Sequence, residues 1–176
     1  MSPSGNNFYY LKYWYYMLEK TEISRCKTRN METKVEIFTD GACSGNPGPA
    51  GIGIVLRCGG RVREYSQFIG LGTNNKAELT AVLRALKMMK KTDLETIVHT
   101  DSQYTIGILT LGWKAKQNKD LVGEILDEMK RFSRLRFAKV EGHANVPLNE
   151  RADELARMGI LTRCSDAMTS EGELDD

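Results

Sequence analysis

The sequence lacks cysteine pairs at the short spacing that zinc sites use, because Cys26, Cys43, Cys58 and Cys164 are scattered. It also lacks an apolar run of membrane-spanning length and the basic, apolar and small-residue segments of a signal peptide. We therefore expect reduced thiols and a cytoplasmic protein with no membrane partner. The formal net charge is only +2, so any nucleic-acid site would depend on where the charges lie.

Three zones differ in composition along the 176 residues, a length that suits one domain. Residues 1–33 combine an aromatic cluster with a polar stretch, and we expect an N-terminal extension. Residues 34–161 carry regular hydrophobic periodicity and form the predicted folded domain. Residues 162–176 are acidic with few apolar side chains, which predicts a disordered tail.

The role of residues 1–33 stays open between three interpretations. The segment is a translated leader ahead of a start at Met31, an aromatic stacking arm for nucleic acid, or an interfacial or partner-binding helix. We favour the first interpretation, because a start at Met31 would place the N-terminus directly before the first residues of the predicted domain.

The middle zone predicts three antiparallel strands followed by alternating helices and strands. The predicted strands are Val35–Thr39, Ile52–Leu56, Arg61–Ile69, Thr96–Thr100 and Arg136–Val140. The predicted helices lie around Leu79–Met89, at Gln103–Leu109, around Leu121–Phe132 and at Glu150–Met158. This order indicates an α/β fold with a five-stranded mixed sheet and helices on both faces.

Four carboxylates lie at the ends of predicted elements. Asp40 and Asp101 end strands, and Glu78 and Asp153 lie in the first turns of helices, so all four could converge. Converged carboxylates repel each other unless a hard cation binds them, which favours Mg²⁺, with Mn²⁺ as the alternative. Two such ions suit phosphodiester hydrolysis, because they activate a water and stabilise the leaving oxygen.

Each acid also has an ordinary structural explanation. Glu78 follows Asn75 by three residues and could complete a helix cap, and Asp153 could favour a helix dipole. Asp40 and Asp101 could be turn residues. Taken singly, these explanations are the stronger ones, so the local sequences decide.

The four local sequences are Thr-Asp-Gly-Ala-Cys-Ser-Gly-Asn-Pro-Gly-Pro at 39–49, Thr-Asn-Asn-Lys-Ala-Glu-Leu at 73–79, Thr-Asp-Ser-Gln-Tyr at 100–104, and Gly-His-Ala at 142–144 followed by Asn-Glu-Arg-Ala-Asp-Glu-Leu-Ala at 149–156. In this order they resemble the motifs of the type 1 ribonuclease H family over residues 35–157. The resemblance implies that residues 34–161 are a catalytic domain. It implies an endonuclease that hydrolyses the RNA strand of RNA–DNA hybrids and leaves 5′-phosphate and 3′-hydroxyl ends.

The resemblance also implies roles for individual residues. Asp40, Glu78, Asp101 and Asp153 match the family's metal-binding acids, which hold two ions with substrate. His143 matches a mobile histidine that assists proton transfer or product release. Asn46, Asn75 and Gln103 match positions that contact the hybrid at its minor groove. Cys43 lies where its backbone could contribute, and Asn74 either serves the DNA strand or caps the helix. Turn-forming and capping roles are compatible with these contacts.

The sequence departs from many family members after the Thr-Asp-Ser motif. The segment 113–120 is too short for their extra helix and basic loop, so the chain resembles the form without this basic protrusion. Lys114, Lys116 and Lys119 either supply a reduced version or belong to a solvated linker. We expect weaker hybrid binding as a result. Glu141, before the histidine motif, either tunes the loop or faces away from substrate.

Three alternatives remain at this stage. A nuclease or strand-transfer enzyme acting on DNA, such as a transposase, integrase core or junction resolvase, could share the acids, although the Gly-Asn-Pro-Gly turn argues against it. A hybrid-binding module without turnover is the second alternative. A ribonuclease H domain that serves a reverse transcriptase in trans is the third. We expect a monomer.

Overall fold

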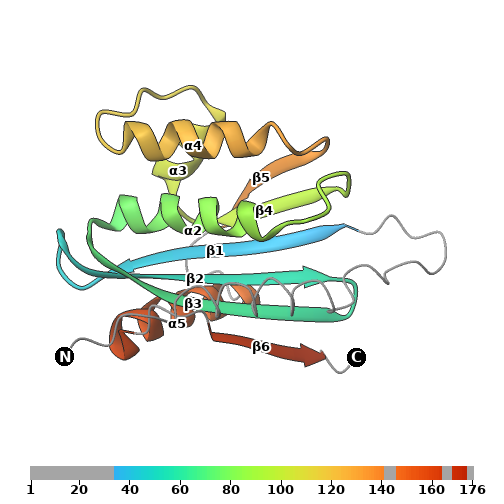
Figure 1. The fold of residues 1–176 in the computed structure, drawn as a ribbon, viewed down its shortest axis with the longest axis horizontal. Coiled ribbons are helices and arrows are strands. Elements are labelled where there is room, and N and C mark those ends of the chain that lie inside the picture. Colours follow the sequence, from blue (N-terminus) through green and yellow to red (C-terminus); the bar gives the residue numbers. More distant parts are fainter. Residues whose placement is uncertain (1–33, 141–145, 164–167, 174–176) are drawn as a thin grey trace, which may run out of the picture. The chain divides into compact units, whose positions relative to one another are not determined.

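The computed structural model describes residues 34–140 and 146–163, together with the backbone of residues 168–173. Its centre is one mixed sheet (Figure 1). Strands β1 (Val35–Cys43), β2 (Gly48–Cys58) and β3 (Arg61–Gly72) form an antiparallel meander. Strands β4 (Thr96–Thr100) and β5 (Leu135–Lys139) continue the sheet beyond β1 in parallel. The predicted five-stranded arrangement is confirmed.

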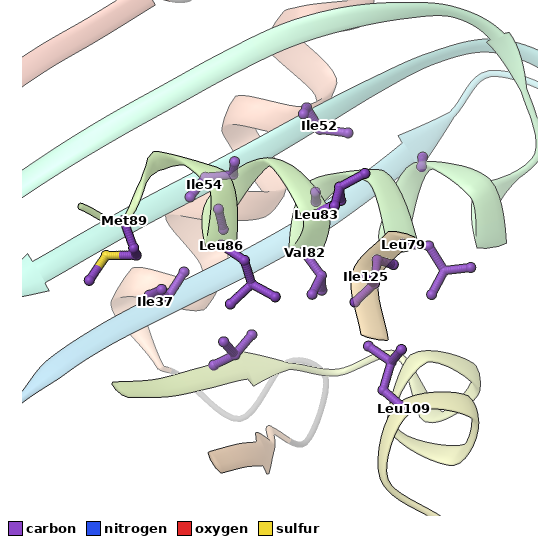
Figure 2. Close-up of a cluster of buried hydrophobic side chains, with 14 of the residues drawn as sticks. Ile37, Ile52, Ile54, Leu79, Val82, Leu83, Leu86, Met89, Leu109 and Ile125 are labelled. Carbon is purple, nitrogen blue, oxygen red and sulfur yellow. The ribbon is translucent and has the colours of Figure 1, made fainter. Parts of the chain in front are cut away.

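Helices cover both faces of the sheet, as predicted. The helices are α2 (Asn74–Met88), α3 (Gln103–Thr110), α4 (Lys119–Met129) and α5 (Pro147–Thr162). Because successive side chains of a strand point to opposite faces, Ile37 packs in the cluster under α2, and Phe38 packs with α5. Figure 2 shows the larger cluster, in which side chains of β1 and β2 meet one face of α2, with Ile125 of α4 and Leu109 of α3 beside it.

Helix α5 lies unusually close to the meander. A Cβ atom on Gly53 of β2 would lie 1.9 Å from the carbonyl oxygen of Ala152. Only glycine permits this contact, so the helix backbone rests directly on the strand. This close packing fixes the distance between α5 and the sheet.

A sixth strand lies within residues 162–176, the zone for which the sequence predicts a disordered tail. Strand β6 (Met168–Glu173) pairs antiparallel with β3, at the sheet edge far from β5. The register sets Arg61 opposite Glu173 and Arg63 opposite Glu171. The backbone pairing covers an edge of β3 that would otherwise be open. Composition alone missed it because the segment has little apolar content.

Within the part of the chain that the structure describes, no helix is both long and apolar enough to cross a membrane.

Candidate active site

Three of the four predicted acids converge at one edge of the sheet. Asp40 lies in β1 and Asp101 follows β4, and these neighbouring strands are parallel, with Phe38 paired to His99 two residues before each acid. Glu78 comes from α2, which crosses over β1. One carboxylate oxygen from each of the three residues lies within 4.8 Å of the other two. Parallel strands therefore bring the acids together, as the sequence predicts.

Gly41 allows Glu78 to reach this position. A Cβ atom at residue 41 would lie 2.3 Å from the backbone nitrogen of Glu78 and 2.4 Å from the carbonyl carbon of Ala77. No side chain larger than hydrogen fits there unless α2 moves away from β1. The sequence alone gives no sign of this role, because a glycine after a strand usually marks a turn.

The helix-cap explanation for Glu78 is wrong. Helix α2 begins at Asn74, and its N-cap is Thr73, whose hydroxyl accepts from the backbone N–H of Lys76. Glu78 therefore lies in the second turn of the helix instead of the first, and its side chain is buried. Its Oε2 atom has no hydrogen-bond partner among the described residues. A buried carboxylate oxygen without a donor is costly, and a bound cation would satisfy it.

Burial and mutual repulsion dominate the electrostatics of these acids. Loss of solvent raises the pKa of Asp40 to about 6, and the nearby charge of Asp101 acts in the same direction. Burial raises the pKa of Glu78 well above its ordinary value, with the charges of Asp40 and Asp101 adding to the effect. A hydrogen bond between Glu78 and Asp40 raises the pKa of Glu78 and lowers that of Asp40. Both carboxyl groups therefore bind protons more readily in the folded protein than in the unfolded chain.

Asp153 faces the same cleft but does not join the tight group of three. Helix α5 begins at Pro147, earlier than predicted, so Asp153 lies in its second turn instead of its first. Proline suits the first helical position, where its missing N–H is not needed. The Asp153 carboxylate accepts a hydrogen bond from Nε of Arg157, one turn further along, at 2.8 Å.

An open cleft of about 840 Å³ contains all four acids. It is also lined by four of the predicted substrate residues: Cys43, Asn74, Asn75 and Gln103. Asn46 is exposed beside it, and its side-chain oxygen accepts from the backbone N–H of Asn74 at 3.2 Å. This contact joins the Gly-Asn-Pro-Gly turn to the start of α2. The thiol of Cys43 donates to the carbonyl of Gly72 at 3.1 Å, so it is already engaged within the protein.

The remaining predicted site residues lie elsewhere. Lys114 and Lys116 are exposed on the connection from 111 to 118, and they do not line the cleft. This connection contains no helix, in agreement with the predicted lack of a protrusion. The backbone N–H of Trp113 donates to the carbonyl of Gly107, and the indole ring of Trp113 covers that glycine. The connection therefore folds back on α3. His143 and Glu141 lie outside the described residues.

Two further residues of α5 line the cleft, Asn149 and Arg157, and neither was predicted from the sequence. Asn149 is buried, and its side-chain oxygen has no hydrogen-bond partner among the described residues. Residues 149, 153 and 157 follow one another at intervals of four, so they lie on one side of the helix. That spacing around Asp153 was the signal that could have identified both.

The donor set suits a hard divalent cation. Asp40, Glu78 and Asp101 offer only carboxylate oxygens, and the described part of the site contributes no sulfur or imidazole ligand. Such ligands favour Mg²⁺ or Mn²⁺ over Zn²⁺. A cation would relieve both the repulsion between the acids and the unpartnered Glu78 oxygen.

Comparison with known proteins assigns the family. Residues 32–161 match the family model "RNase H". The ribonuclease H of Chlorobium phaeovibrioides is 42% identical over 74% of this chain and 97% of its own length. The ribonuclease H of Aromatoleum aromaticum is 45% identical over 74% and 92%.

Solved structures agree. Ribonuclease H1 of the archaeon Halobacterium salinarum is 32% identical with a TM-score of 0.65, and the match covers 74% of this chain and 99% of that one. LC11-RNase H1, solved in complex with an RNA/DNA hybrid, is 33% identical with a TM-score of 0.63 over 73% and 98%. The chain therefore belongs to the ribonuclease H family.

Proposed function

We propose that this protein is an endoribonuclease that hydrolyses the RNA strand of RNA–DNA hybrids. The observation that carries the proposal is the convergence of Asp40, Glu78 and Asp101, with Asp153 facing the same cleft. The family membership and the hybrid bound by LC11-RNase H1 support the choice of substrate. The products carry 5′-phosphate and 3′-hydroxyl ends.

The four acids would hold two divalent ions with substrate, Mg²⁺ or alternatively Mn²⁺. When bound, such ions supply an activated water and stabilise the leaving oxygen of an in-line displacement. The protein fixes the carboxylates on β1, the end of β4, α2 and α5, so little reorganisation is needed when substrate arrives. His143 would carry a proton or assist product release.

Polar groups beside the acids would select RNA. The 2′-hydroxyl both donates and accepts hydrogen bonds in the minor groove of the hybrid. Asn75 and Gln103 line the same cleft as the acids, and Asn46 is joined to Asn74 beside it, so amide groups are available near the acids. The backbone at Cys43 would add a further contact. Lys114 and Lys116 would contact phosphates further along the hybrid.

The test is cleavage of four end-labelled substrates with Mg²⁺: an RNA–DNA hybrid, single-stranded RNA, duplex RNA and duplex DNA. The proposal predicts cutting of the hybrid alone, in its RNA strand, with a 5′-phosphate on the downstream fragment. Cutting of duplex DNA would indicate a DNA nuclease or strand-transfer enzyme instead. Hybrid binding without cleavage would indicate a binding module.

We further propose that the protein is a monomer of the cytoplasm. The four acids lie within one folded domain, so the proposed site needs no residue from a second copy. Sedimentation equilibrium at micromolar concentration tests the monomeric state, and a dimer mass would contradict it.

A further inference from the structure

Arg157 forms a two-point ion pair with Asp153 at the edge of the acid cluster. Its Nε lies 2.8 Å from one carboxylate oxygen, and its terminal nitrogen contacts the other oxygen. Both residues lie on α5, and their side chains are 62% and 34% exposed. A two-point pair of this kind occupies both oxygens of the carboxylate that the proposed function needs as a metal ligand.

The charge of Arg157 is isolated among acids. Five of the described residues that line the cleft are acidic: Asp40, Glu78, Asp101, Glu150 and Asp153. Arg157 is the only basic residue among the described lining residues. Arg157 therefore supplies the one positive charge among the described side chains that line this cleft.

The other arginine of the same helix behaves differently. Arg151 binds Glu64 of β3 and Glu154, at 2.7 and 2.8 Å, and it does not line the cleft. Its pair joins α5 to the meander, which is a structural role. The pair of Arg157 joins no two elements, since both partners belong to α5. A purely structural explanation for Arg157 is limited to the small contribution of an exposed helical ion pair.

We infer that Arg157 is a resident counter-ion that holds Asp153 in the metal-free protein and competes with divalent cations for its carboxylate. The inference rests on the proposed function, because it takes Asp153 as a metal ligand. Arg157 is a positioning residue in this scheme, since it acts on the metal site through Asp153. When a cation binds, Asp153 exchanges its guanidinium partner for the ion, and the positive charge of Arg157 is released toward the cleft.

The experiment measures Mn²⁺ binding without nucleic acid, by the electron paramagnetic resonance signal of the free ion. Arg157→Gln removes the competitor, and we expect Mn²⁺ to bind about five-fold more tightly than in the wild type, the upper range for an exposed ion pair. Arg157→Lys keeps the positive charge, so its affinity for Mn²⁺ should stay close to that of the wild type. Arg84→Gln removes an exposed charge from α2 outside the cleft and should change nothing.

A double-mutant cycle with Asp153→Asn separates competition from a general charge effect. If Arg157 acts through Asp153, then Arg157→Gln should change Mn²⁺ affinity less than two-fold in the Asp153→Asn background. An equal five-fold gain in both backgrounds would overturn the inference, as would unchanged affinity in the single variant. Both results would leave the proposed function standing, since Mn²⁺ still binds. Failure of wild type and Arg157→Gln alike to bind Mn²⁺ would instead overturn the proposed metal site, and the inference with it.

Discussion

Asp40 illustrates at the scale of a single residue how a functional site costs stability. Its side chain is buried beside Asp101 and Glu78, and its pKa rises from 3.8 to about 6. A folded-state pKa above the unfolded value means that the ionised group destabilises the fold. This penalty is absent below the unfolded pKa, grows as pH rises to about 6, and is complete at neutral pH.

Asp40→Asn should therefore stabilise the metal-free protein by about 2 kcal/mol at pH 7, given about 1.4 kcal/mol per unit of pKa shift and some sharing with Glu78. Urea unfolding in chelator at pH 7 and at pH 3 measures this, and the gain should vanish at pH 3. Addition of Mg²⁺ should stabilise the wild type but not the variant. A variant less stable than the wild type in chelator would contradict the account.

The same ionisation makes cation binding dependent on pH. Protons and metal ions compete for Asp40 and Glu78, so Mn²⁺ affinity should fall as pH is lowered through about 6. We expect at least a ten-fold weaker affinity at pH 5 than at pH 7, because two raised carboxyl groups must lose their protons. Equal affinities at the two values, measured by titration calorimetry, would show that the acids are already ionised.

Gly41 is the residue on which the approach of α2 depends. Gly41→Ala would place a methyl group against the backbone of Ala77 and Glu78, and we expect a loss of about 2 kcal/mol of stability. Displacement of Glu78 should also weaken Mn²⁺ binding more than ten-fold. The matched control is Gly123→Ala, an exposed position of α4 with open space around it, which should gain about 1 kcal/mol from helix propensity. Tight metal binding by Gly41→Ala would refute this role.

At the scale of elements, the long hydrophobic patterns were predictable and the element ends were not. The alternation around Ile37 and the stripe of α2 follow from burial alone. The early start of α5 at Pro147 and the extension of β1 through Asp40 to Cys43 depend on tertiary contacts. Strand β6 depends on pairing across the sheet, which composition does not encode.

Strand β6 should contribute to stability without affecting the reaction. Removal of residues 164–176 opens the edge of β3, and we expect a loss of about 1 kcal/mol of stability, because the backbone pairing between β3 and β6 is lost. Hybrid cleavage should continue, because the acids lie on β1, α2, α5 and after β4. Urea unfolding and cleavage rates of the truncated chain check both statements. An unchanged unfolding free energy would mean that the pairing adds nothing.

At the scale of the whole molecule, charge placement should set the strength of hybrid binding. The net charge is +2, and five of the six charged residues that line the described part of the cleft are acidic. The connection from 111 to 118 is short. Each phosphate contact contributes roughly 0.9 to the slope of log affinity against log salt on duplex DNA, so few contacts give a shallow slope. Changing Lys114 and Lys116 together to alanine should lower that slope by about two. An unchanged slope, from fluorescence anisotropy in Ca²⁺, would place both lysines in a solvated linker.

The site itself was partly predictable from the sequence. The four acids could be predicted as candidate metal ligands because their local sequences match the motifs of one family in the same order. Taken singly, each carboxylate would have been interpreted as a helix-cap or turn residue. Arg157 and Asn149 were missed because their significance depends on which side of α5 faces the cleft. The role of His143 and the boundaries of the three zones remain predictions.

Cleavage of an RNA–DNA hybrid at saturating Mg²⁺ by Asp101→Asn and by Asp127→Asn tests whether the converged carboxylates perform the reaction. Asp101 belongs to the converged acids, while Asp127 is an exposed acid of α4 paired with Lys130. We expect the rate of Asp101→Asn to fall by about a hundred- to a thousand-fold, the usual effect of losing one essential electrostatic group. Hybrid binding should be retained, and Asp127→Asn should cleave at the wild-type rate. Cleavage by Asp101→Asn at the wild-type rate would show that the converged carboxylates do not perform the reaction.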